Sequence, residues 1–235
     1  MKKKVIFILL VTIIVAVIFG IIYSQNQKIK NTDAYKIKVE YEKLNGKESS
    51  SGKTIRTLNI PVNNRIKYST AKEIVKKIDN GDSFVVYFGF ASCPWCRSMI
   101  NNLIDLSNEY MVDVYYVDVQ NIRDELQVVN GKVTRTKDGD KYYMELLDRL
   151  DEVLSDYSLT VDDVSYETNE KRIYAPNVVA ITNGKTEKLT EGISEKLTDP
   201  YEKLTDEMIK ESKEQLECIF KCMEKAGICI KENAC

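Results

Sequence analysis

The chain has 235 residues, a net charge of -2 and 30% charged residues, which suits one domain with appendages or two small domains and excludes the basic excess of a nucleic-acid-binding protein. Its hydrophobic content of 43% permits a packed core and excludes wholesale disorder. No histidine is present, which excludes Ser-His-Asp and Cys-His catalysis and histidine zinc sites. Carboxylate, lysine, tyrosine or cysteine chemistry remains, and the chain contains six cysteines.

The first segment is a lysine cluster followed by an apolar run over residues 5–23. The run approaches the ~20 residues that span a bilayer and exceeds the ~7–15 apolar residues of a cleaved signal peptide. We expect a cytoplasmic basic tip (1–4) and an uncleaved transmembrane signal anchor (5–23), which would place the rest of the chain outside the membrane, where disulfides persist. A cleaved signal peptide and a buried helix are the alternatives.

A polar stretch over residues 24–54, rich in lysine and serine, is interpreted as a flexible stalk. The folded domain is expected over residues 55–226, beginning with a short edge strand over residues 57–61 that ends at a proline. A helix should follow between Thr70, which is suited to cap it, and Asn80, where an Asn-Gly pair ends it.

The next element carries the chemistry. A continuous apolar run over residues 84–90 is typical of a strand buried on both faces, and it leads into Cys93-Pro94-Trp95-Cys96 at the start of an amphipathic helix. Cys93 would lie at the helix N-terminus, where free N–H groups and the helix dipole favour the reactive thiolate. Cys96 would lie one turn further on, placed to attack a mixed disulfide on Cys93. This pattern predicts thiol–disulfide exchange, which needs no metal and no cofactor.

Half of a four-cysteine zinc site and an inert structural disulfide are the alternatives for this motif. A zinc ribbon needs a second Cys-x-x-Cys some ~15–20 residues further on, and the sequence has none there. The position between a strand and a helix disfavours an inert disulfide, because exchange chemistry gains from the helix end.

At this point the sequence resembles the thioredoxin-fold oxidoreductases. Residues 84–99 are similar to the active-site strand, motif and helix of that family, residues 111–120 to its next parallel strand, and residues 173–185 to its cis-proline segment, strand and Asn-Gly turn. The resemblance covers roughly residues 70–223. It implies a thioredoxin-like α/β fold, in which helices flank a central mixed sheet.

The same resemblance assigns the site residues. It implies that Cys93 and Cys96 are catalytic and that Pro176 is a cis-proline that packs against them. Ala175 would offer backbone hydrogen bonds to a bound substrate strand. Pro94 and Trp95 belong to the same substrate-binding surface.

Two buried positions depart from the family. Tyr87 stands where the family carries a buried aspartate, and Tyr116 where it carries a lysine on the next strand. Both family residues are implicated in proton transfer at the buried cysteine, so the proton acceptor for Cys96 is unassigned. Tyr87 is a candidate, although a tyrosine with a pKa near 10 is a poor base and core packing is its ordinary role.

A further departure is an insertion of about residues 121–172, which we expect to be helical. Asn-Gly and Asp-Gly pairs at residues 130–131 and 138–139 indicate hairpin turns, and apolar spacing over residues 143–154 indicates an amphipathic helix. Such an insertion would shape a substrate groove or partner surface, or would only extend the core.

The last segment contains four cysteines on a terminal helix expected over residues 205–226 and on a tail over residues 227–235. Outside the membrane they are candidates for one or two structural disulfides, and our first interpretation is a nested pairing. That pairing joins Cys222 to Cys229 and Cys218 to Cys235. A second redox relay and a site of four thiolates around a metal are the alternatives.

Together these observations predict a thiol–disulfide oxidoreductase in the cell membrane, with a single pass, a cytoplasmic N-terminus and an extracytoplasmic catalytic domain. It resembles bacterial accessory redox proteins. Its expected partners are thiol- or disulfide-containing proteins or peptides and a membrane or extracytoplasmic redox partner, with no nucleic acid. The alternatives are a non-catalytic binding or scaffold module and a thiol chaperone for metal or haem assembly. The sequence leaves the direction of electron flow open.

Overall fold

The centre of the molecule is a five-stranded mixed sheet with the strand order β1-β3-β2-β8-β9. The structure is a computed structural model that describes residues 2–227, with side chains from residue 14 onward except residue 26. The strands are β1 (Ile66–Tyr68), β2 (Phe84–Gly89), β3 (Val114–Asp118), β8 (Asn177–Thr182) and β9 (Lys185–Thr190). β1, β3 and β2 run parallel, β8 is antiparallel to β2, and β9 is antiparallel to β8.

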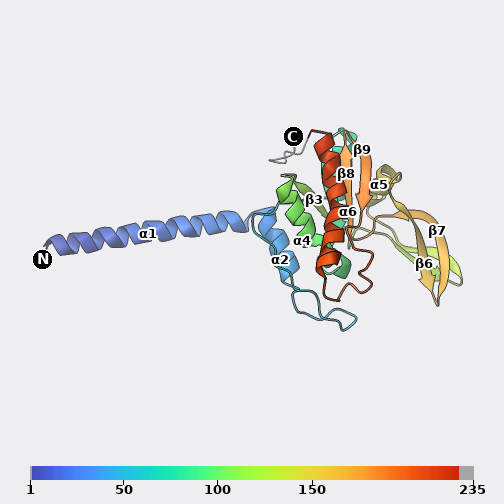
Figure 1. Cartoon of the computed structure of the whole chain (residues 1–235), viewed down its shortest axis with the longest axis horizontal. Coiled ribbons are helices and arrows are strands. Elements are labelled where there is room, and N and C mark those ends of the chain that lie inside the picture. The colour runs from blue at the N-terminus through green and yellow to red at the C-terminus, as the bar shows by residue number, and fades with distance from the viewer. Residues whose placement is uncertain (1, 228–235) are drawn as a thin grey trace.

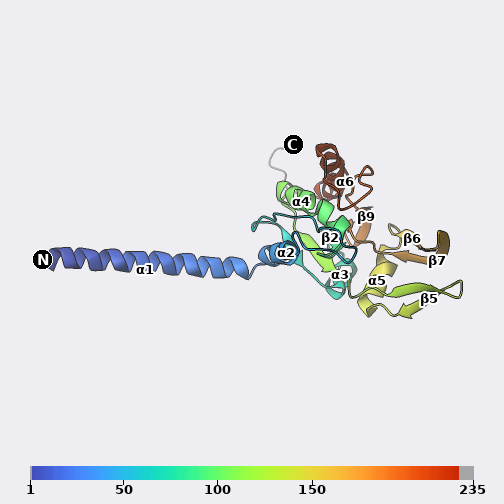
Figure 2. The same ribbon diagram turned by 90° about the horizontal axis from the view of Figure 1, so that it is seen from below.

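Helices cover both faces of this sheet (Figures 1 and 2). One face packs against α2 (Asp33–Glu42), α4 (Pro94–Glu109) and α6 (Asp206–Lys225), and the other against α3 (Ala71–Asp79) and α5 (Lys141–Leu150). Strand β2 is buried along its whole length. Its side chains alternate, so that Val85 and Tyr87 face α4 while Val86 and Phe88 face α3 and α5. The predicted mixed sheet with flanking helices is confirmed.

The stalk predicted over residues 24–54 is wrong for most of its length. Helix α1 (Lys2–Lys30) continues through its first part, and α2 begins directly afterwards with Thr32 as its N-cap. Ile37 and Tyr41 of α2 are fully buried in the core beside α4. These two residues lie one turn apart on the same face of α2, and this face docks the helix against the core. The folded domain therefore begins near Asp33 rather than near Ile55.

The edge strand predicted over residues 57–61 is also wrong. Its backbone is held by side chains instead of by a neighbouring strand: the Leu58 amide donates to Asn45 at 3.0 Å, and the Ile60 amide donates to Glu42 at 2.7 Å. The sheet has β1 and β9 at its two edges, and β1 pairs with β3. The helix predicted after Thr70 is α3, and Thr70 forms the expected capping box with Glu73.

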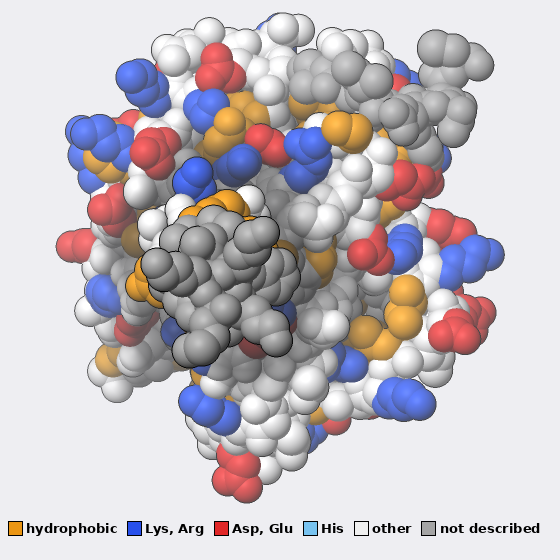
Figure 3. Space-filling view, turned by 90° about the vertical axis from the view of Figure 1, so that its left-hand side faces the viewer, with side chains coloured by type: hydrophobic (Ala, Val, Ile, Leu, Met, Phe, Trp, Pro, Cys, Tyr) orange, Lys and Arg blue, Asp and Glu red, His pale blue; other side chains and the backbone are white. Residues whose placement is uncertain are grey.

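Helix α1 extends away from the domain (Figure 1). The structure describes side chains only from residue 14 onward, so the first part of the anchor predicted over residues 5–23 lies outside the described side chains. Within the described part of the chain, no helix has both the length and the apolar character needed to cross a membrane. Figure 3 looks along α1 and shows charged side chains of both signs scattered over the face around it.

The insertion after β3 is only partly helical. It contains α5 between two hairpins, made of β4 (Glu125–Val129) with β5 (Lys132–Lys137) and of β6 (Ser155–Val161) with β7 (Val164–Arg172). The predicted turn at residues 130–131 joins β4 to β5. The second predicted hairpin, at residues 138–139, is wrong, because this pair precedes Asp140, the N-cap of α5.

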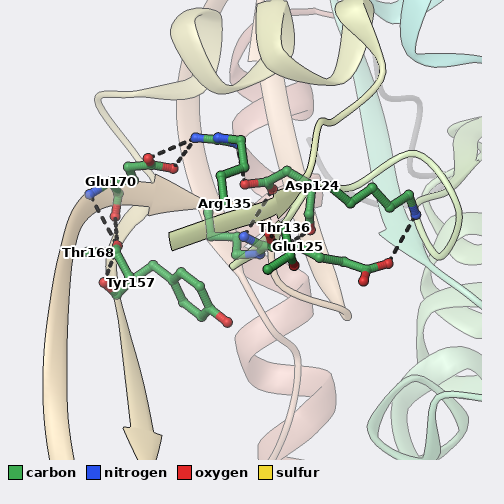
Figure 4. Close-up of polar contacts among 9 residues, drawn as sticks. Asp124, Glu125, Arg135, Thr136, Tyr157, Thr168 and Glu170 are labelled. Carbon is green, nitrogen blue, oxygen red and sulfur yellow. Dashed lines mark hydrogen bonds and ion pairs between the residues drawn. The ribbon is translucent and has the colours of Figure 1, made fainter. Parts of the chain in front are cut away.

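A polar cluster joins the two hairpins (Figure 4). Arg135 on β5 binds Asp124, and its other guanidinium nitrogen binds both carboxylate oxygens of Glu170 on β7 at 2.8 Å. Asp124 is buried and also accepts an ion pair from Arg172 at 2.9 Å. The hairpins are therefore fixed to each other by charge as well as by packing.

Helix α6 agrees with the predicted terminal helix and is capped by Thr205. It carries Cys218 and Cys222, which are both free thiols in the structure. Cys229 and Cys235 lie outside the described residues, so the predicted nested disulfides stay a prediction.

Candidate functional site

The two motif cysteines lie where β2 passes into α4. Cys93 is the N-cap of α4 and Pro94 occupies the first turn, where no backbone N–H is required. The amide of Cys96 donates to the sulfur of Cys93 at 3.2 Å, so the backbone of the first turn points at that sulfur. Both residues are free thiols, and both are buried.

The two sulfurs have opposite pKa shifts. The Cys96 thiol donates a hydrogen bond that lowers the pKa of Cys93 against the opposing effect of burial, and the amides of Cys96 and Trp95 lower it further. Burial raises the pKa of Cys96 well above its usual range. The first sulfur therefore ionises more readily than an ordinary cysteine, whereas the second keeps its proton.

A proline loop faces these cysteines. The Ala175–Pro176 peptide bond is cis, as predicted. The loop directly precedes β8, and the antiparallel pairing of Phe88 with Asn177 brings it to the end of β2 that carries the motif. The Cys93 thiol donates to the carbonyl oxygen of Ala175 at 3.2 Å. The structure thus brings Cys93, Ala175 and Pro176 together.

A groove of about 380 Å³ opens beside the motif. One part of it is lined by Trp95 and residues 174–176. The rest is lined by five residues of the segment between β9 and α6: Glu191, Ile193, Ser194, Glu195 and Leu197. Pro94, predicted for the same surface, lies outside this lining. The groove carries the carboxylates of Glu191 and Glu195, and burial raises the pKa of Glu191.

Below Cys96 lies a buried cluster of tyrosines. The hydroxyl oxygens of Tyr87 and Tyr41 are 2.8 Å apart, and the ring of Tyr87 stacks on Tyr116 with centroids 5.4 Å apart. A hydrogen bond from Tyr87 to Cys96 lowers the pKa of Cys96, against the larger effect of burial. Tyr41 was missed by sequence reasoning because it falls in the predicted stalk.

Arg97, directly after the motif, is a second residue that sequence reasoning missed. Its side chain is 1% exposed. The guanidinium donates to the carbonyl oxygens of Tyr41, Ala91 and Arg56 and to the Asn45 side chain at 2.5–3.1 Å. It therefore ties α2 and the loop after it to the start of α4. An arginine beside a cysteine motif was the available signal.

Arg123, at the beginning of the insertion, is a third residue that sequence reasoning missed. Its guanidinium lies 5.5 Å from the ring centroid of Phe90, and its positive charge contributes to lowering the pKa of Cys93. The insertion therefore supplies charge to the site as well as a surface. Across the described residues, no group of three or more cysteine, aspartate or glutamate side chains is arranged to hold a metal ion.

Comparisons with known proteins complete the description. No family model matches the chain, and no curated protein matches it. Among solved structures, the chain is similar to thioredoxin O2 from Arabidopsis thaliana in its oxidised state, at 14% identity and a TM-score of 0.33, over 69% of this chain and 94% of that one. The strand order and flanking helices of this chain themselves fit a thioredoxin-like α/β fold.

Proposed function

We propose that this protein is a thiol–disulfide oxidoreductase that exchanges disulfides with protein or peptide substrates through Cys93 and Cys96. The observation that carries the proposal is the position of Cys93 as N-cap of α4, where its sulfur accepts from the Cys96 amide and contacts the cis-proline loop, with Cys96 fully buried one turn further on. In agreement with this geometry, the pKa of Cys93 is lowered and the pKa of Cys96 is raised. A sulfur that ionises readily can attack, and a buried sulfur beside it can resolve the product.

The exchange proceeds in two balanced steps. The Cys93 thiolate attacks one sulfur of a substrate disulfide, a mixed disulfide forms, and the other substrate sulfur leaves as a thiolate that takes a proton from water. Cys96 then gives its proton to water and attacks the Cys93 sulfur, which closes the Cys93–Cys96 disulfide and releases the second substrate thiolate. The substrate disulfide gains two electrons and the two protein thiols lose two. The reverse sequence oxidises a substrate dithiol.

The groove beside the motif supports a peptide substrate. It presents the Trp95 ring and the cis-proline loop next to the reactive sulfur, and the groove is open along residues 191–197. An extended segment lying there would bring its own sulfur to Cys93. In the free protein the Ala175 carbonyl is bound by the Cys93 thiol, and ionisation of that thiol would release it for a substrate amide.

The same proposal includes a location. Residues 5–23 would act as a single-pass membrane anchor behind the cytoplasmic residues 1–4, with the domain outside and a redox partner in the membrane or beyond it. Its support is the apolar run in the sequence. Fractionation of bacterial cells that express the chain should recover it with the membranes, and protease added to spheroplasts should digest the domain. Recovery of the intact chain in the soluble fraction would contradict the location.

The exchange itself is tested with a chromogenic aromatic disulfide. Cys93→Ser should abolish reaction at the motif, and Cys96→Ser should leave a stable mixed disulfide on Cys93 that mass spectrometry detects. Cys218→Ser is the matched control, because it removes an exposed thiol outside the motif. If Cys93→Ser reacts at the motif as fast as the unaltered chain, the protein is not an oxidoreductase of this kind.

A further inference from the structure

The resolving step requires a buried sulfur to become negative. Cys96 is fully buried, and burial raises its pKa well above the usual range. Tyr87 packs in the same buried cluster as Cys96, and its hydroxyl lies against position 89, at the end of β2 that leads to the motif. Beside the effect of burial, the Cys93 thiol raises the pKa of Cys96, and hydrogen bonding to the Tyr87 hydroxyl and the Phe90 backbone lowers it. Once Cys93 is in a mixed disulfide, its thiol proton is gone. The Tyr87 hydroxyl is then the side-chain donor that remains among these groups.

We propose that Tyr87, held in place by Tyr41, donates the hydrogen bond that stabilises the Cys96 thiolate when it attacks the mixed disulfide. Tyr87 is thus a catalytic residue of the second step, and Tyr41 is its positioning residue. The inference rests on the proposed function, since it concerns the second sulfur of that exchange.

The two hydroxyls form a hydrogen-bonded pair in the same buried cluster as Cys96. Their oxygens are 2.8 Å apart and both side chains are fully buried. If Tyr41 donates to Tyr87, the Tyr87 proton is free to point at Cys96. Consecutive hydrogen bonds in a low-dielectric interior polarise one another. A charged acceptor at the end of such a chain gains more than a neutral one, so the thiolate is favoured over the thiol.

Arg97 fixes the far end of this chain. One guanidinium nitrogen donates to the Tyr41 carbonyl oxygen at 2.9 Å, and the guanidinium lies 5.9 Å from the centroid of the Tyr41 ring. No ion pair to a carboxylate is formed by Arg97 in the described structure. Its bonds go instead to the backbone of α2 and the neighbouring loops. Arg97 therefore holds Tyr41, and through it the Tyr87 hydroxyl.

Gly89 makes room for the Tyr87 ring. A Cβ atom at position 89 would lie 2.3 Å from the Tyr87 hydroxyl oxygen and 2.5 Å from the ring carbon that bears it. Real Cβ atoms do not approach so closely, so any larger residue at position 89 would displace the hydroxyl. The glycine at the end of β2 is thus required by the position of a hydroxyl next to the catalytic sulfur.

The other titratable and charged groups around Cys96 have different partners. Glu40 on α2 accepts hydrogen bonds from Tyr116 on β3 at 3.0 Å and from Tyr68 on β1. On α6, Cys222 packs at the edge of the same core and its thiol donates to the Cys218 carbonyl oxygen at 3.2 Å. On α4, the Cys93 sulfur accepts from the Cys96 amide, and Arg97 donates to backbone carbonyl oxygens.

The resolving step can be isolated in the full chain once serine replaces the cysteines outside the motif, since Cys218 is an exposed free thiol that would itself react. Cys93 is first converted to its mixed disulfide with thionitrobenzoate, rapidly and at acidic pH, and release of the coloured thiolate by Cys96 is followed after a jump to higher pH. We expect Tyr87→Phe to slow this release by about tenfold and to move its pH profile to higher pH, because a hydrogen bond to a charged group is lost. Tyr41→Phe and Gly89→Ala should act in the same direction.

Tyr116→Phe is the matched control. It removes a hydroxyl from a ring that stacks on Tyr87, but that hydroxyl bonds to Glu40. Release should keep its rate and pH profile in this variant. Circular dichroism spectra that match the unaltered chain show that each variant is folded.

The outcomes separate the two proposals. If no mixed disulfide forms at Cys93, the proposed function fails. If the mixed disulfide forms and is resolved by Cys96, but Tyr87→Phe releases thionitrobenzoate with the rate and pH profile of the unaltered chain, the function stands and the role of Tyr87 is refuted. Equal slowing by Tyr87→Phe and Tyr116→Phe would also refute it, because the effect would then belong to the core as a whole.

Discussion

The hydroxyls of Tyr41 and Tyr87 meet at 2.8 Å in the core, although the two residues come from α2 and from the central strand β2. This contact joins a polar segment near the start of the chain to the strand that delivers the cysteine motif. Helix α2 is therefore part of the domain, and one of its side chains contacts the strand that leads into the cysteine motif.

Because α2 is docked against the core, we expect its buried residues to contribute to the free energy of unfolding. Ile37→Ala should lower the free energy of unfolding by about 2–5 kcal/mol, because it opens a cavity in a fully buried position. Val39→Ala on the same helix should change it by less than about 0.5 kcal/mol, since Val39 is 46% exposed. Urea unfolding measures both. Equal stabilities for the two variants would mean that the segment behaves as the stalk that the sequence first indicated.

The elements that sequence reasoning found have strong local signals. The run over residues 84–90 has no polar residue, Thr70 and Glu73 form a capping box, and Pro94 marks the start of α4. In each case neighbouring residues alone determine the structure. The position of Cys93 at the helix N-terminus could be predicted for the same reason.

The elements that it missed depend on partners far away in the chain. Helix α2 has two buried residues among lysines and glutamates, and β1 is only three residues long. The hairpins of the insertion are mostly exposed, and the long-range bonds of Arg135 hold them together. Tyr87 could be singled out from the sequence as a candidate. Its hydrogen bond with the Tyr41 hydroxyl could not, because that contact forms only when α2 docks against the core.

Arg97 gives a second prediction. Arg97→Lys should lower the free energy of unfolding by about 3 kcal/mol, because a single ammonium group cannot satisfy the buried acceptors that the planar guanidinium binds. Those acceptors come from α2, from the loop after it and from the segment before the motif. Arg149→Lys is the control, since Arg149 pairs with Asp79 at the surface, where such a change costs less than about 1 kcal/mol. Denaturant titration of both variants decides the matter, and similar losses would show that Arg97 holds no buried network.

The pKa of Cys93 gives a third prediction. A hydrogen bond from the Cys96 thiol is the largest cause of its lowered pKa, so Cys96→Ala should raise that pKa towards the ordinary value of about 8.5. Cys96→Ser should raise it less, because a hydroxyl also donates. The pKa of Cys93 in the unaltered chain and in the two variants is measured from the rate of its alkylation as a function of pH. A pKa that stays the same in Cys96→Ala would place the cause in the helix N-terminus alone.

The stability of the reduced protein should fall at alkaline pH, and the sign follows from the two cysteines. The pKa of Cys93 is lowered by folding, so its contribution grows as pH rises through its folded pKa and is complete above the unfolded pKa of about 8.5. The pKa of Cys96 is raised by folding, so above pH ~8.5 the unfolded chain loses a proton that the folded chain keeps. In that range the free energy of unfolding should decrease by up to about 1.4 kcal/mol for each pH unit on account of Cys96.

Cys96→Ala should remove this part of the slope, and so should oxidation of the motif to its disulfide, which leaves no thiol to titrate. Chemical unfolding at several pH values up to the range where tyrosines ionise, near pH 10, measures the slope. A reduced protein as stable at the alkaline end as at pH 8 would mean that Cys96 ionises in the folded state as easily as in the unfolded chain.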